Sequence, residues 1–192
     1  INLFLTNTKF QATEKLENKL KPKKKRIGIL GGSFDPAHKG HLAISKEAYK
    51  RFNLKSVIWA ITNHNPFKKK ASNNLKKRIA HCKKIIRYNK FIKIKYFENL
   101  IRSNKTSDLI DYLDKKNKYE LFFLMGADNL IKFHKWYKCK NILRKSKLIV
   151  FDRHGYKKNS LNSKTYKNFH NKKVAFIEFN KVNISSSQLR KI

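Results

Sequence analysis

Cysteine and long hydrophobic runs are scarce in this sequence. The two cysteines, Cys82 and Cys139, lie far apart, with neither a Cys-x-x-Cys spacing nor a nearby histidine pair, which disfavours a disulfide framework and a zinc site and favours thiols in a reducing compartment. No apolar stretch approaches the roughly 20 residues that cross a bilayer, and the apolar block 1–5 lacks the basic lead-in of a signal peptide. We therefore predict a cytoplasmic protein that has no membrane partner.

Acidic residues are also few, 12 against 47 lysines and arginines, for a formal net charge of +35. Such a charge favours anionic ligands and invites a nucleic-acid interpretation. However, the cations comprise 39 lysines and only 8 arginines, spread along the chain beside 20 asparagines. Nucleic-acid readers rely on arginine for bidentate contacts, whereas this composition is typical of A/T-rich codons. We predict no specific nucleic-acid partner.

The length of 192 residues suits one α/β domain with a substantial core. We predict an N-terminal extension or linker over 1–24, which ends in a run of basic residues, and a single domain over 25–192. Helical periodicity marks 74–88 and a segment that begins near Thr106 or Ser107, either of which is a reasonable cap. The polar, turn-rich stretch 153–173 is predicted to be a surface loop. Apolar runs predict strands near 27–30, 57–61, 121–125, 147–151 and 174–179, and the alternation of apolar residues with lysine at 92–96 predicts an edge-type strand.

Alternation of strands and helices predicts a mostly parallel sheet with helices on both faces, a Rossmann-like architecture. Ligands of such sheets bind at the carboxyl ends of the strands, where the strand order reverses. Each notable motif follows a strand and should therefore lie on that edge. These motifs occupy 31–41, 62–68, 126–128 and 185–190.

The run 31–41, GGSFDPAHKGH, joins an apolar strand to a helix. Glycines there allow close backbone approach and unusual dihedral angles, and amide groups at a helix N-terminus attract anions. His38 and His41, three residues apart, can donate hydrogen bonds to one phosphate group. Taken alone, a His-x-x-His pair is equally compatible with a surface pair or an adventitious metal site, and Gly31-Gly32 with a simple turn. The continuous run is more specific than its pieces.

With this run, the chain resembles the His-x-Gly-His nucleotidyltransferase superfamily. The later segments are similar to bacterial nicotinate-nucleotide adenylyltransferases, over about 26–191. They are NPFK at 65–68, TSD at 106–108, MGADNL at 125–130, FHKWY at 133–137 and ISSSQLR at 184–190. One departure is Lys105, which stands where the family usually has an aromatic residue.

The resemblance implies adenylyl transfer from ATP to nicotinate mononucleotide, which gives deamido-NAD and pyrophosphate in NAD biosynthesis. It implies His38 and His41 as catalytic residues. Mg²⁺ would be bound through ATP phosphates and water, with no protein metal site. The implied ATP-binding residues are Gly31, Gly32, Ser33, Phe34, His38, His41, Gly126, Asp128, Ser186, Ser187 and Arg190, and the implied nicotinate-nucleotide-binding residues are Lys68, Thr106, Trp136 and Tyr137.

Other interpretations stay open at this point. Lys68 is also one lysine in a solvated run, Asp128 could be a helix N-cap, and Trp136 could belong to the core. The acceptor could instead be nicotinamide mononucleotide or phosphopantetheine. A basic nucleic-acid-binding protein is the alternative of a different class, and it leaves the histidine motif unexplained. The sequence gives no basis for an oligomeric state.

Overall fold

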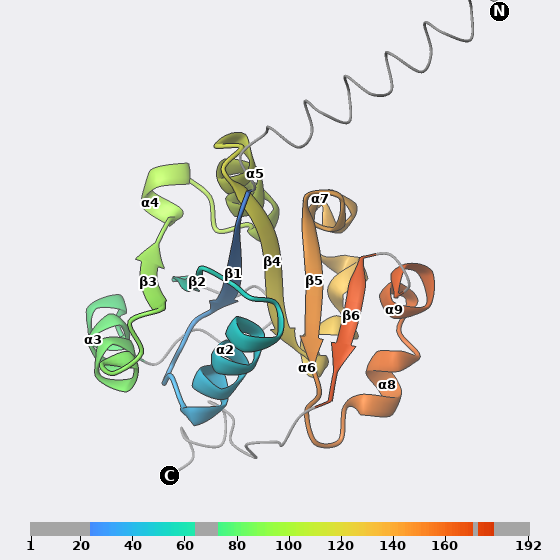
Figure 1. The fold of residues 1–192 in the computed structure, drawn as a ribbon, viewed down its shortest axis with the longest axis horizontal. Coiled ribbons are helices and arrows are strands. Elements are labelled where there is room, and N and C mark those ends of the chain that lie inside the picture. Colours follow the sequence, from blue (N-terminus) through green and yellow to red (C-terminus); the bar gives the residue numbers. More distant parts are fainter. Residues whose placement is uncertain (1–23, 64–72, 171–172, 179–192) are drawn as a thin grey trace, which may run out of the picture.

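The computed structural model describes residues 24–63, 73–170 and 173–178. In this part of the chain, six strands form one sheet in the order β3-β2-β1-β4-β5-β6, and every neighbouring pair is parallel (Figure 1). The prediction of a mostly parallel α/β sheet is confirmed. The strands are β1 (Lys25–Gly32), β2 (Ser56–Ile61), β3 (Ile92–Tyr96), β4 (Tyr119–Gly126), β5 (Ser146–Phe151) and β6 (Val174–Ile177).

The burial of each strand follows its composition. The apolar residues 121–125 of β4 are all buried at the centre of the sheet, whereas β3, whose lysines alternate with apolar residues, lies at an edge. From the central pair β1 and β4, the chain runs outward to β2 and β3 on one side and to β5 and β6 on the other. The strand order therefore reverses between β1 and β4, which places a ligand crevice at their carboxyl ends.

Helices cover both faces of the sheet (Figure 1). One face carries α2 and α3, whose Ala48 and Cys82 are completely buried against it. The other face carries α5, α6, η1 and α7, through residues such as Ile110, Phe133 and Ile142. The elements are α2 (Lys39–Arg51), α3 (Leu75–Ile86), α4 (Glu98–Ile101), α5 (Thr106–Lys115), α6 (Ala127–Leu130), the 3₁₀ helix η1 (Phe133–Lys135), α7 (Cys139–Lys145), α8 (Lys157–Leu161) and α9 (Lys164–Phe169).

The predicted helix starts are partly right. The helix expected over 74–88 is α3, and the Asn74 side chain caps it by accepting a hydrogen bond from the Lys77 amide (2.9 Å). Helix α5 begins at Thr106 as predicted, but its N-cap residue is Lys105, without a side-chain cap. The expectation that Thr106 or Ser107 caps it is therefore wrong: both lie inside the first turn, where the Ser107 hydroxyl bonds to α7 instead.

The expectation of a surface loop over 153–173 is wrong, because α8 and α9 lie within it. Both helices are short, so local periodicity is a weak signal for them. Their stability comes from tertiary contacts: Ser160 and Thr165 are buried, and Tyr166 and Phe169 pack against the core. Ser163 caps α9 by accepting a hydrogen bond from the Tyr166 amide (3.2 Å).

Both cysteines are free thiols, as expected. Cys82 is completely buried, and this burial raises the pKa of its thiol to about 12. A thiol with so high a pKa is a poor nucleophile, which assigns Cys82 to packing. Among the described residues, no helix has both the length and the apolar character that a membrane crossing requires.

At the amino ends of the strands, Glu120 joins three neighbouring strands. Its carboxylate accepts from Arg26 Nε in β1 (2.9 Å) and from Lys147 Nζ in β5 (2.6 Å). Burial acts to raise the pKa of the Glu120 carboxyl, but these hydrogen bonds outweigh it and lower the pKa below its ordinary value. The contribution of these two ion pairs to the free energy of unfolding is therefore present above the unfolded-state pKa of the Glu120 carboxyl, about 4.3, and is lost as the pH falls through the folded-state pKa.

We expect Glu120→Gln to lower the free energy of unfolding at pH 7 by up to about 1 kcal/mol, because the three side chains are partly exposed. The difference from the unsubstituted protein should shrink as the pH falls from 5 to 3. Urea unfolding followed by circular dichroism at several pH values measures this difference. A difference that does not change with pH would show that the carboxylate's charge plays no part.

Candidate active site

A pocket of about 380 Å³ opens at the carboxyl ends of β1 and β2, beside α4, the start of α5 and the η1 segment. Five of the residues singled out in the sequence line it, although they come from three distant parts of the chain. The glycines follow β1, Thr106 begins α5, and the aromatic pair follows η1. These five residues are Gly31, Gly32, Thr106, Trp136 and Tyr137.

His38 and His41 form a reciprocal cap at the N-terminus of α2. His38 is the N-cap residue, and its Nδ1 accepts a hydrogen bond from the Gly40 amide (3.1 Å). His41 Nδ1 accepts in turn from the His38 amide (3.2 Å). This is a capping box in which histidines take the places of the usual Ser or Thr and Glu or Gln. The two rings lie together, with centroids 3.9 Å apart.

These backbone bonds decide the tautomer of both rings. A neutral imidazole carries one N–H, and a nitrogen that accepts a hydrogen bond cannot be the protonated one. Because both Nδ1 atoms accept from backbone amides, each neutral ring holds its proton on Nε2. Both histidines are thereby set as Nε2–H donors at a helix N-terminus, where the helix dipole already favours an anion.

Contacts with buried side chains hold the ring and the backbone of His41 in place. The Phe34 ring lies 4.8 Å from the His41 ring and stacks on Trp59 at 4.9 Å, centroid to centroid. Trp59 Nε1 donates to Ser45 Oγ (2.8 Å), and this hydroxyl donates to the His41 carbonyl (2.8 Å). Phe34, Trp59 and Ser45 are all buried. The first turn of α2 is thus anchored to β2 through Ser45 and Trp59, which no motif had marked.

The glycines of the motif act differently from expectation. Gly31 and Gly32 belong to β1, and neither has a positive φ, so the expected unusual dihedral angles are wrong for them. The left-handed residue is Phe34, at φ 49°, a strained conformation for a bulky side chain. Burial of its ring against His41 and Trp59 compensates for this strain. Gly31 and Gly32 instead present bare backbone to the pocket.

Arg78, on α3, ties the loops after β1 and β2 together. It is only 2% exposed. Its Nη1 donates to the Ser33 carbonyl (2.6 Å) and to the Thr62 carbonyl (2.8 Å). Glu98 holds the second loop from the other side, accepting from Thr62 Oγ1 and from the Asn63 amide (3.0 Å). Neither Arg78 nor Glu98 was predicted from the sequence. The signal available for Arg78 was its position, as a basic residue, on the apolar stripe of α3.

The end of β4 presents a carboxylate. Asp128 is the second residue of α6, and its Oδ2 pairs with Arg153 Nη1 at 2.7 Å. The N-cap of α6 is Gly126, so the alternative that Asp128 is the cap is wrong. A Cβ on Gly126 would lie 2.6 Å from Asp128 Oδ1, closer than atoms can approach. Gly126 is therefore the residue that leaves room for this carboxylate.

Trp136 is both packed and accessible. Its ring lies 5.3 Å from Phe133 and 6.1 Å from Phe123, centroid to centroid, yet it lines the pocket. The core and ligand interpretations of this residue are therefore compatible. Tyr137 is half exposed beside it. Lys105 also lines the pocket and brings a cation to its rim.

Several predicted residues lie outside the described part of the chain: Lys68, Ser186, Ser187 and Arg190. The roles expected of them stay predictions. The same holds for the division at 24/25, because the description begins at Lys24.

Similarity to known proteins shows the family of this chain. The family model described as cytidylyltransferase-like matches residues 29–192. A curated protein of Pelagibacter ubique, named "Probable nicotinate-nucleotide adenylyltransferase", is 61% identical over 178 residues, which cover 93% of this chain and 99% of that protein. The chain belongs to the nicotinate-nucleotide adenylyltransferase family. A Bradyrhizobium protein of the same name is 40% identical over 130 residues, 67% of each chain.

Solved structures support the same fold for this adenylyltransferase chain. The nicotinic acid mononucleotide adenylyltransferase of Plasmodium falciparum, solved in complexes with NaAD and with APC, superimposes with TM-scores of 0.70 and 0.71. The sequence identity is 23%, and the match covers 87% of this chain and 83% of that chain. The predicted Rossmann-like nucleotidyltransferase fold is thus confirmed.

Proposed function

We propose that this enzyme transfers the adenylyl group of ATP to nicotinate mononucleotide, with deamido-NAD and pyrophosphate as products. The observation that carries the proposal is the 61% identity to a nicotinate-nucleotide adenylyltransferase along 99% of its length. The site geometry supports it: a pocket with aromatic lining residues opens at the carboxyl ends of β1 and β2, and the loop after β1 leads to a helix N-terminus that carries two histidines.

The chemistry needs positioning more than activation. A phosphate oxygen of nicotinate mononucleotide attacks the α-phosphorus of ATP, a new P–O bond forms, and the bond to the bridging oxygen breaks as pyrophosphate departs. The attacking phosphate is already ionised near pH 7, since its second pKa is about 6. No protein nucleophile is therefore required, and catalysis rests on orientation and on stabilising the developing charge.

The described residues divide between the two substrates. In this proposal the His38 and His41 Nε2–H groups donate to ATP phosphates, with His41 closest to the charge that develops at the α-phosphorus. Backbone groups of 31–34 serve both nucleotides, and Gly126 and Asp128 border the adenosine, with the Asp128 carboxylate on the ribose hydroxyls. Trp136 stacks on the pyridine ring, and Thr106 with the Tyr137 backbone contacts its carboxylate. Lys68, Ser186, Ser187 and Arg190 would bind phosphates.

Mg²⁺ fits this arrangement as a ligand of ATP. The ion retains waters and needs few protein ligands when phosphates are present. The proposal gives Mg²⁺ no protein ligand. When bound, the ion neutralises phosphate charge. A location in the cytoplasm stays a prediction.

Purified protein with ATP, Mg²⁺ and one acceptor at a time tests the proposal. We expect pyrophosphate release with nicotinate mononucleotide, and a kcat/KM at least about tenfold lower with nicotinamide mononucleotide, because a carboxylate contact is replaced by an amide. Mass spectrometry identifies deamido-NAD as the product. Release with phosphopantetheine alone would overturn the assignment of the acceptor.

A further inference from the structure

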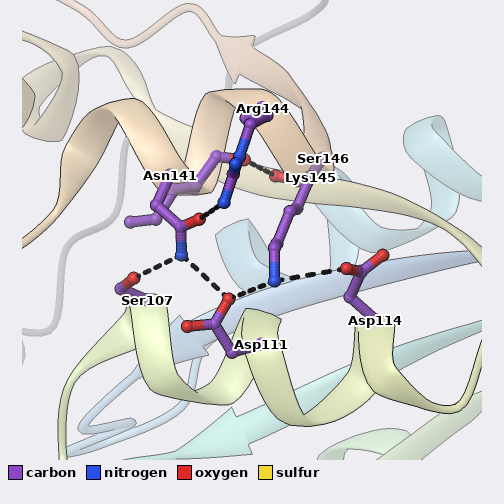
Figure 2. A network of polar contacts seen from close by, with 8 residues as sticks. Ser107, Asp111, Asp114, Asn141, Arg144, Lys145 and Ser146 are labelled. Atoms are coloured by element: carbon purple, nitrogen blue, oxygen red, sulfur yellow. Dashed lines mark hydrogen bonds and ion pairs between the residues drawn. The ribbon is translucent and has the colours of Figure 1, made fainter.

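A polar network joins α5 to α7 (Figure 2). Asn141 of α7 lies at its centre. Its Nδ2 donates to Ser107 Oγ (3.0 Å) and to Asp111 Oδ1 (2.8 Å), both on α5. Its Oδ1 accepts from Arg144 Nη2 (2.8 Å). All three bonds agree with one orientation of the amide, so the network holds Asn141 in a single rotamer.

The network has an inner part, which contains Ser107 and Asn141, and an outer part, which contains Lys145 and Asp114. Asp111 joins the two parts. Lys145 Nζ pairs with Asp111 Oδ1 at 2.7 Å and with Asp114 Oδ2 at 3.3 Å, toward the C-terminal end of α5. Burial acts to raise the pKa of the Asp111 carboxyl, but the hydrogen bonds from Lys145 and Asn141 outweigh it and lower the pKa. Asp111 is therefore a carboxylate at neutral pH. The Ser107 end is completely buried, whereas the Asp114 end is partly exposed.

The inner part adjoins both walls of the pocket. Ser107 directly follows Thr106, which lines the pocket at the first residue of α5. On the other helix, the Cys139 amide at the start of α7 donates to the Trp136 carbonyl (3.1 Å). Trp136 and Tyr137, which directly follow η1 and precede α7, also line the pocket. A shift of α7 against α5 would thus change the separation between Thr106 and the aromatic pair.

We propose that Asn141 is a positioning residue for the pyridine nucleotide. By bonding Ser107 and Asp111 together, it sets the separation of the two walls between which the ring and its carboxylate bind. Asn141 does not line the pocket and acts through Thr106 and Trp136. This inference rests on the proposed function. It predicts an effect on one substrate only, because the residues proposed to bind ATP belong to neither α5 nor α7.

Asn141→Ala tests the inference in steady-state kinetics with the full-length protein. We expect the KM for nicotinate mononucleotide to rise about fivefold, with the KM for ATP and kcat within twofold of their original values. Asn141→Asp should act similarly, since it places a carboxylate against Asp111. The matched control is Asp114→Ala, which removes a contact from the outer part of the same network and should leave both KM values unchanged.

A double variant distinguishes the loss of this hydrogen bond from a loss of folding. Asn141→Asp combined with Asp111→Asn exchanges donor and acceptor across the same contact, so the hydrogen bond re-forms and the KM for nicotinate mononucleotide should return to within twofold of the original. An unchanged KM in Asn141→Ala, or equal rises for both substrates, would overturn the inference alone. An unsubstituted protein that is inactive with nicotinate mononucleotide would overturn the proposed function, and this inference with it.

Discussion

Replacement of His41 by alanine is expected to lower kcat at least about 100-fold. The reason is the loss of an Nε2–H donor directed at charge that appears only in the transition state, where one such donor contributes on the order of 10²–10³ in rate. Such a group affects kcat and kcat/KM together, whereas a ground-state contact would raise KM alone. Pyrophosphate release at saturating ATP and nicotinate mononucleotide measures the effect.

His41 also accepts a hydrogen bond from the His38 amide, so its removal weakens the start of α2. The control is His41→Gln, because glutamine at this position restores an ordinary capping box without an imidazole. We expect His41→Gln to unfold at nearly the temperature of the unsubstituted protein and yet to be as slow as His41→Ala. If glutamine restored the rate, an imidazole would not be required at this position.

The sheet and its functional edge could be predicted because their signals are local. Most strands coincide with apolar runs, whereas β3 shows an alternation of apolar residues with lysines. The motifs 31–41 and 126–128 lie at strand ends, where the topology rule for parallel sheets expects a ligand site. The histidine pair is the clearest case, because the N-cap position of α2 brings together residues three apart. No long-range information was needed to predict that the two rings lie close together at the start of a helix.

The partners of the motif residues could not be predicted, because they depend on contacts distant in the sequence. Arg78 reaches the Ser33 carbonyl across 45 positions, and Arg153 reaches Asp128 across 25. In a chain with 47 basic residues, nothing local distinguishes Arg153 from solvated ones, and the local signal for Arg78 is its place on the apolar stripe of α3. Their burial and geometry arise only when the strands align, as does the link from Asn141 to Ser107. The same limit explains the short helices α8 and α9, which depend on tertiary contacts.

Asp128 offers the second large effect, on the nucleotide side of the site. Asp128→Ala is expected to raise the KM for ATP about 30-fold, because a charged hydrogen bond to the ribose contributes about 2 kcal/mol. Asp128→Asn, which keeps the shape next to Gly126, should give a smaller rise of the same kind. The KM for nicotinate mononucleotide should change little in either variant.

Loss of the carboxylate also leaves Arg153 without the partner it holds at 2.7 Å, so a rise in KM alone does not prove a ribose contact. Substrates that lack one hydroxyl resolve this point. With 2′-deoxy-ATP or 3′-deoxy-ATP, the unsubstituted enzyme should lose about tenfold in kcat/KM, since a polar site rejects an analogue that leaves its groups unpaired. Asp128→Ala has already lost the contact and should show almost no further penalty with at least one of the analogues. Equal penalties in both enzymes would instead assign Asp128 to holding Arg153 in place.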